Sequence, residues 1–281
     1  MTTRPIRSST YYKNNGNVNF VKTSNGVKLK SEKEIEILKE GGRRHAEILR
    51  LLSEMVEPGV STLTLEEEAL RLIKMSGDIP AHLGYTPAGA RRPFPAALCV
   101  SINDEIVHGI PNEAPKVLKQ GDVAAIDLSI IHKGMFTDSC ITVPVGIVDD
   151  EARELLAVTK RALEAGIAVA KPGNHIGDIG TAISKVIKGT RFSLAENLVG
   201  HGLGYSLHEE PYVPNVGRKG EGAKLLPGMV IAIEPMVNTG SGGIRQMKDG
   251  YTIKTRDGSR SAHFEHTVAI TEKGNIILTK E

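Results

Sequence analysis

The chain of 281 residues contains no tryptophan, only two cysteines and few aromatic side chains, which make up 4% of the sequence. Cys99 and Cys140 are too few for a disulfide framework or a thiolate zinc site, which favours a reducing compartment. No apolar run approaches the roughly 18 residues of a membrane span, and the N-terminus lacks the apolar core of a secretory signal. These absences exclude disulfide-rich secreted and membrane-spanning classes and predict a cytoplasmic protein.

Acidic residues are missing from residues 1–30, which carry six basic residues and many Asn, Ser and Thr. This composition predicts a polar, basic and flexible N-terminal extension. Its charge suits a transient contact with the ribosome, and its faint likeness to a transit peptide leaves organellar targeting open. The other residues include 29 basic and 33 acidic ones, a net charge of −4, which argues against DNA as a partner.

The rest of the chain has the composition of a folded protein and contains an internal repeat. Residues 118–130 and 225–237 share Leu, Gly, Val, Ala and Ile at equivalent positions, followed by a carboxylate, Asp127 or Glu234. Upstream, each copy has a Pro-Gly turn and then a His-Gly pair, at residues 58–59 and 108–109, and at 172–173 and 201–202. The repeat predicts two related halves that share one core.

Periodic apolar residues predict two helices in each half, beginning near Ser31, Thr64, Asp150 and Asn174. Gly77 is expected to end the second of them. Runs typical of strands follow at residues 97–103, 122–131, 135–145, 229–238, 250–255, 263–271 and 275–280. Each half is therefore helix, helix, strands. We expect an α+β fold with helices covering one face of a largely antiparallel sheet.

Two aspartates lie on a predicted hairpin. Asp127 belongs to an apolar strand, and Asp138 follows a turn signal at residues 132–134. A hairpin that turns between residues 132 and 133 places the two carboxylates directly opposite each other. Opposed carboxylates repel unless a cation lies between them, so this pair points to a metal.

Two more acids and a histidine occur in similar surroundings. Glu234 and Glu265 interrupt apolar strand-like runs, where an ionised carboxylate must be paired, protonated or bound to a metal. His201 lies between glycines, which allow close approach of the backbone. Four carboxylates and one imidazole carry too much negative charge for one ion, but they suit two divalent ions such as Mn, Fe(II), Co or Zn. His108 and His208 remain for proton transfer or for stabilising an oxyanion.

The combined motifs resemble type I methionine aminopeptidases, a branch of the M24 metallopeptidases, over residue 31 to the C-terminus. They lie at residues 101–111, 200–204, 208–211, 233–238 and 264–267. The resemblance implies a pseudo-symmetric pita-bread fold, with residues 31–281 forming one catalytic domain whose halves span about 31–148 and 149–281. It also implies removal of the initiator methionine from nascent polypeptides whose second residue is small, by a monomeric enzyme that binds no membrane.

The resemblance also suggests residue roles. Asp127, Asp138, His201, Glu234 and Glu265 match the family's dinuclear metal ligands, with Asp138 and Glu265 bridging. His108 and His208 match its substrate-contacting and proton-handling histidines. A methionine pocket is implied at Tyr85, Phe94, Cys99 and Tyr251, and a monovalent cation at Asn103 and Ser261. The chain departs from the family pattern in the long segment 86–98, and in His263, which stands where many relatives carry Gln.

Two other functions share these features. A proline-directed peptidase of the same fold usually carries a large additional N-terminal domain, for which a 30-residue leader leaves no room. A non-catalytic binding module of this fold typically loses metal ligands, whereas all five matching residues are present here. Both alternatives are therefore less favoured than the aminopeptidase.

Overall fold

The computed structural model describes residues 21–22 and 26–280. The predicted extension up to residue 20 lies outside the described residues. Val27 and Lys30, which the sequence assigned to that extension, are instead buried: Val27 packs in a hydrophobic core, and Lys30 Nζ lies 2.9 Å from Glu209 Oε2. The packed body therefore begins before Ser31.

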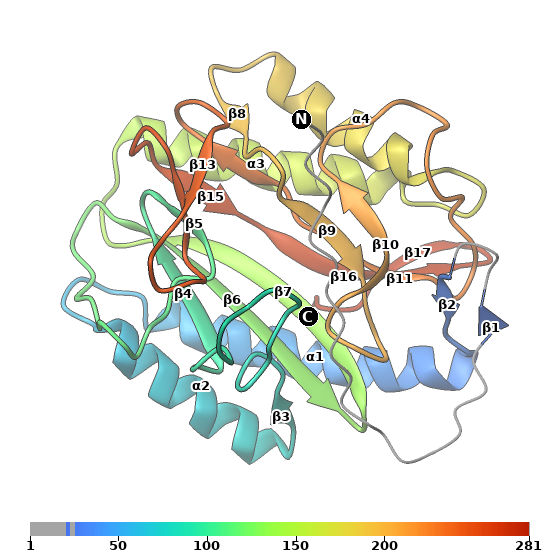
Figure 1. The fold of residues 1–281 in the computed structure, drawn as a ribbon, viewed down its shortest axis with the longest axis horizontal. Helices are drawn as coiled ribbons and strands as arrows, with labels where there is room; N and C mark the ends of the chain where they lie inside the picture. Colours follow the sequence, from blue (N-terminus) through green and yellow to red (C-terminus); the bar gives the residue numbers. More distant parts are fainter. Residues whose placement is uncertain (1–20, 23–25, 281) are drawn as a thin grey trace.

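The predicted pairs of helices are present (Figure 1). They are α1 (Glu32–Glu54), α2 (Thr62–Ser76), α3 (Asp150–Val169) and α4 (Ile176–Lys188). Ser31 caps α1 as expected, but Ser61, not Thr64, caps α2, because the Ser61 hydroxyl accepts a hydrogen bond from the Thr64 N–H. Gly77 ends α2 in a left-handed conformation, as predicted. Among the described residues, no helix is both long and apolar enough to cross a membrane.

The largest sheet has nine strands, all paired antiparallel, in the order β10-β9-β11-β16-β7-β6-β3, with β17 beside β16 and β4 beside β6. These strands are β3 (Ile79–Pro80), β4 (Leu98–Ile102), β6 (Val123–His132), β7 (Met135–Pro144), β9 (Val199–Gly202), β10 (Glu209–Pro214), β11 (Val230–Ile233), β16 (Glu265–Thr271) and β17 (Gly274–Ile277). Three smaller antiparallel sheets are also present among the described residues. One contains β15 (Ser261–His263), β12 (Met236–Asn238) and β8 (Ser193–Leu194), and another contains β13 (Ile244–Gln246), β14 (Ile253–Thr255) and β5 (Glu105–Val107). The third pairs β1 (Val21–Lys22) with β2 (Lys28–Leu29).

Each half has a hydrophobic core between its helices and its strands. In the first half, α1 and α2 pack on β4 and β6 through residues such as Leu52, Leu65 and Ile126. In the second half, α3 and α4 pack on β11 and β16 through residues such as Leu155 and Ile183. Figure 1 shows β7 and β16 side by side, where the two halves meet. This arrangement confirms the predicted repeat of helices and antiparallel strands.

The hairpin of β6 and β7 turns one residue later than predicted, so the cross-strand partner of each residue shifts by two residues. His132 pairs with Met135, so the turn consists of Lys133 and Gly134, both with positive φ (48° and 82°). Such a two-residue turn matches the twist of the strands, and glycine adopts its second position without strain. Asp127 is therefore opposite Cys140, and Asp138 is opposite Ser129. The two aspartates are diagonal neighbours on one face, and the prediction that they oppose each other directly is wrong.

Candidate metal centre and substrate cavity

A cavity of about 910 Å³ is lined by residues from both halves. It collects all of the predicted metal-binding, catalytic and methionine-pocket residues: Tyr85, Phe94, Cys99, His108, Asp127, Asp138, His201, His208, Glu234, Tyr251 and Glu265. Asn103 and Ser261, the predicted monovalent-cation pair, do not line it. They contact each other instead, through a hydrogen bond from the Ser261 N–H to the Asn103 carbonyl (2.8 Å).

Strand alternation directs the carboxylates into this cavity. In β6, Ile126 and Leu128 pack in the hydrophobic core, so Asp127 between them faces the opposite side of the sheet. Asp138 lies in β7, and Glu265 is the first residue of β16. Glu234 directly follows β11 and precedes a proline, which ends the strand there.

His201 has the tautomer of a metal-binding imidazole. Its Nδ1 donates a hydrogen bond to the Gly202 carbonyl (3.0 Å), which leaves the lone pair on Nε2. Nε2 lies 3.5 Å from Glu234 Oε1 and 3.8 Å from Asp138 Oδ2. Ligand atoms of Asp138, His201 and Glu265 all lie within 4.8 Å of one another.

The electrostatics of the carboxylates fit bound cations. Burial, together with the neighbouring carboxylates, raises the pKa of Asp127, Glu234 and Glu265 well above the usual range, and burial raises the pKa of Asp138 to about 7. Within the described part of the chain, Asp127 Oδ1 and Glu265 Oε1 are buried without a hydrogen-bond partner. Divalent ions would occupy these oxygens and restore the ionised form of all four groups.

His108 and His208 are neutral at physiological pH. Burial lowers the pKa of His108 to about 4, and burial with neighbouring histidines lowers that of His208 well below its usual value. The rings of His208 and His201 lie 4.3 Å apart, and Tyr85 Oη lies 2.7 Å from His208 Nδ1. His108 has a left-handed backbone (φ 59°), a strained conformation that often marks a functional position.

Three of the four predicted methionine-pocket residues form one apolar cluster. Phe94, Cys99 and Tyr251 pack together, and the rings of Phe94 and Tyr251 meet edge to face at 5.1 Å. Tyr85 belongs to a neighbouring cluster with Leu207. Arg92, from the long segment 86–98, lines the cavity and lies over the Tyr251 ring at 5.9 Å.

Sequence reasoning gave no site role to three buried polar residues near the site. His82 Nδ1 lies 3.9 Å from Cys99 Sγ, and its Nε2 lies 2.8 Å from Ser129 Oγ. His82 had no motif around it, because the loop that carries it meets the sheet only in the folded chain. Ser129 could have been found as the next residue on the cavity face after Asp127. His263 Nε2 lies 3.6 Å from Glu234 Oε2 and was noted only as a departure from the family pattern.

Buried carboxylates and an imidazole at the edge of a water-accessible cavity define a metal-dependent hydrolase. The sequence matches the metallopeptidase family M24 over residues 36–272. It is 46% identical to a methionine aminopeptidase of Aquifex aeolicus, over 90% of this chain and 99% of that protein. It is 43% identical to methionine aminopeptidase 1 of Bacillus subtilis, over 89% of this chain and 98% of that protein.

The fold comparison agrees. The crystal structure of a methionine aminopeptidase of Thermotoga maritima superposes with a TM-score of 0.86 at 40% identity, over 91% of this chain and 100% of that one. The chain therefore belongs to the methionine aminopeptidases of metallopeptidase family M24. Both the family resemblance and the predicted pita-bread fold are confirmed.

Proposed function

We propose that this chain hydrolytically removes the initiator methionine from nascent proteins whose second residue is small. The observation that carries the proposal is the convergence of Asp127, Asp138, His201, Glu234 and Glu265 with two neutral histidines on one cavity. The named relatives, which this chain matches over 98–100% of their length, support the same substrate and do not favour a proline-directed enzyme or a binding module. Because the proposed substrates are nascent proteins, the location that goes with this proposal is the cytoplasm.

Two divalent ions are the cofactors of this proposal, each Co, Mn, Fe(II) or Zn. Asp127, Asp138, His201, Glu234 and Glu265 would hold them, with Asp138 and Glu265 bridging. When bound, the ions would supply an activated water and polarise the scissile carbonyl. Ser129 Oγ donates a hydrogen bond to Asp138 Oδ1 (2.6 Å) and so fixes the orientation of that carboxylate.

The histidines would handle the substrate and its protons. If the Tyr85 hydroxyl donates to His208 Nδ1, the proton of the neutral ring is on Nε2. His208 could then donate a hydrogen bond to the oxygen that gains charge as the peptide bond is attacked. His108, neutral and buried in the cavity lining, would contact the substrate and stabilise the same transition state. Phe94, Cys99 and Tyr251, with Tyr85 beside them, would accept the methionine side chain.

Residues 31–281, together with the packed residues 27–30, would act as one catalytic domain, monomeric in solution, with halves that divide near residues 148 and 149. Asn103, which directly follows β4, and Ser261, the first residue of β15, would hold a monovalent cation. Melting temperatures in KCl, NaCl and choline chloride would test that cation. We expect a higher melting temperature in KCl or NaCl than in choline chloride, and we expect Ser261→Ala to remove this difference.

The basic segment before residue 21 is proposed as a ribosome contact. Cosedimentation with ribosomes, with and without residues 2–20, tests this role.

Release of free methionine from the peptide Met-Ala-Ser by the full chain tests the function. We expect release that a chelator abolishes and that Mn²⁺ or Co²⁺ restores. A panel varied at the second position should show cleavage after Met before Ala, Gly or Ser and little before Leu or Arg, because a clash with a bulky residue has no compensating contact. Efficient cleavage of X-Pro bonds without Met, or no methionine release by the metal-loaded protein, would overturn the proposal.

A further inference from the structure

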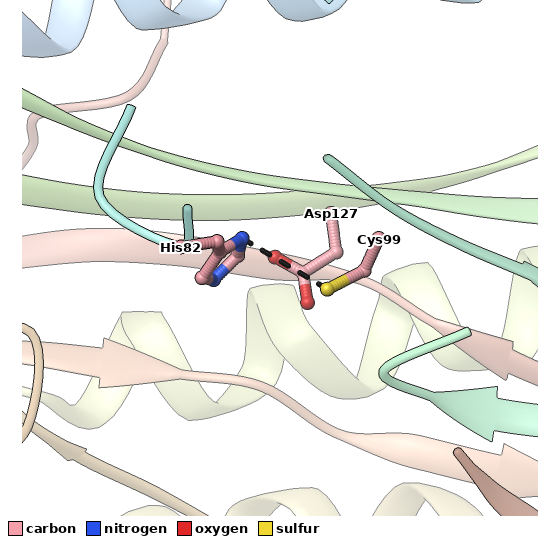
Figure 2. A group of neighbouring side chains, drawn as sticks. All are labelled: His82, Cys99 and Asp127. Atoms are coloured by element: carbon pink, nitrogen blue, oxygen red, sulfur yellow. Dashed lines mark hydrogen bonds between the residues drawn. The ribbon is translucent and has the colours of Figure 1, made fainter. Parts of the chain in front are cut away.

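A second group of potential metal ligands lies beside the proposed dinuclear centre. His82, Cys99 and Asp127 are all buried, and their ligand atoms lie within 4.8 Å of one another. Cys99 of β4 is the direct cross-strand partner of Asp127 of β6, so both side chains lie on the same face of the sheet. His82 approaches from the loop after β3, and the three side chains point toward one another (Figure 2). The proposed function gives no role to His82 and none as a metal ligand to Cys99.

Neighbouring hydrogen bonds orient His82 for metal binding. Ser129 Oγ donates to Asp138 Oδ1 (2.6 Å), so its oxygen accepts from His82 Nε2 at 2.8 Å. In the tautomer that carries its proton on Nε2, the neutral imidazole has its lone pair on Nδ1, which lies 3.9 Å from Cys99 Sγ. A ring held by its second nitrogen in this way is the usual arrangement of a metal-binding histidine.

We propose that His82 Nδ1, Cys99 Sγ and the Asp127 carboxylate bind a third divalent cation, of which zinc is the best match. Nitrogen, sulfur and oxygen donors together suit this borderline-soft ion, and three protein ligands leave its fourth position open to water in the cavity. Asp127 can serve both this ion and the dinuclear centre, because a carboxylate has two oxygens, and Oδ1 has no hydrogen-bond partner within the described residues. On binding, the Cys99 thiol loses its proton to solvent.

The location of this ion would make it an inhibitor. Cys99 packs with Phe94 and Tyr251 in the cluster that we propose accepts the methionine side chain, so the ion and the substrate would compete for one space. This consequence rests on the proposed function, whereas the binding of the ion does not. Excess zinc should raise the apparent KM for Met-Ala-Ser and leave kcat unchanged.

Cobalt provides a test that does not depend on activity. The full chain, loaded with two equivalents of Co²⁺, is titrated with further Co²⁺ and followed in the near ultraviolet, where a cobalt–thiolate bond gives a charge-transfer band. We expect the band to appear with the third equivalent and to disappear in Cys99→Ser. His82→Phe should weaken binding of the third ion about tenfold or more. Zinc should displace the cobalt and bleach the band.

Cys140→Ser is the matched control. Cys140 is also a cross-strand partner of Asp127 and is also buried, but its Sγ donates to the His263 carbonyl (3.6 Å) and it does not line the cavity. The band should therefore survive this substitution. No band in the wild-type protein, or an unchanged band in Cys99→Ser, would overturn the proposal. If Cys99→Ser does not fold, as judged by circular dichroism, wild-type affinity in His82→Phe would overturn it equally. Methionine release from Met-Ala-Ser is measured separately, so failure of the zinc site and failure of the aminopeptidase assignment remain distinguishable.

Discussion

The buried ion pair of Lys30 and Glu209 offers a quantitative test of how the N-terminal segment supports the site. The side chains are 1% and 2% exposed, and Lys30 Nζ lies 2.9 Å from Glu209 Oε2. The other Glu209 oxygen accepts hydrogen bonds from the N–H groups of Tyr205 (2.6 Å) and Ser206 (2.8 Å). These contacts hold the turn that presents His208 to the cavity.

Lys30→Met would leave the Glu209 charge buried and unpaired, which costs about 3–5 kcal/mol of the free energy of unfolding. Burial lowers the pKa of Lys30 despite its partner, so desolvation of the pair outweighs much of its attraction. The double variant with Glu209→Gln should therefore recover a large part of the loss. Lys39→Met is the control, because Lys39 pairs with Glu36 on the exposed side of α1 and should change stability by less than about 1 kcal/mol.

Equilibrium unfolding in urea gives the free energy of unfolding of the four proteins: wild type, Lys30→Met, the double variant and Lys39→Met. The dependence of this free energy on urea concentration should be the same in all four. A Lys30→Met protein within about 1 kcal/mol of wild type would refute the reasoning, because Glu209 would then be solvated or protonated at little cost. A double variant as unstable as the single one would show that the loss comes from packing of the lysine stem and not from an isolated charge. If the pair also positions His208, kcat should fall in Lys30→Met while bound metal stays at the wild-type level.

The other predictions concern the proposed metal centre. Glu234→Ala or Asp127→Ala should abolish turnover and lower the metal content measured by elemental analysis; full activity with normal metal content would contradict the assignment. His108→Ala should lower kcat by about 10²–10⁴ with metal retained, whereas loss of metal would make His108 a ligand. The metal-free protein should lose stability as pH rises from about 4 to about 7, because folding raises the pKa of Asp138 from 3.8 to about 7 and so favours its protonated form. Added metal or Asp138→Asn should flatten this pH dependence in thermal melts.

Local patterns in the sequence were enough to predict the side chains on the cavity face of the strands. Because strand residues alternate between faces, a carboxylate among apolar residues, such as Asp127 between Ile126 and Leu128, must face away from the core and needs a partner there. The same reasoning found Glu265 at the start of β16. These predictions needed only neighbouring residues, so they did not depend on the three-dimensional arrangement.

Features that depend on tertiary contacts could not be predicted in this way. The turn at Lys133 and Gly134 lies one residue later than predicted and shifts the cross-strand partners by two residues, since several residues in that segment are plausible turn formers. Lys30 looked like part of a basic tail, because its partner Glu209 is distant in the sequence. His82 reaches the site from a loop with no periodic pattern, and only the fold brings it next to Cys99.

The motif around His201 shows how a local signal and a tertiary contact together make a metal ligand. Glycines on both sides predicted close backbone approach, and a Cβ at Gly202 would indeed lie 2.3 Å from the Glu210 carbonyl oxygen. The same glycine fixes the tautomer of His201, because the Gly202 carbonyl accepts a hydrogen bond from His201 Nδ1. The lone pair is then on Nε2, which lies near Asp138 and Glu234. A side chain at position 202 would push β9 away from β10 and disturb this tautomer. The glycine therefore contributes to the proposed metal site although it provides no ligand atom.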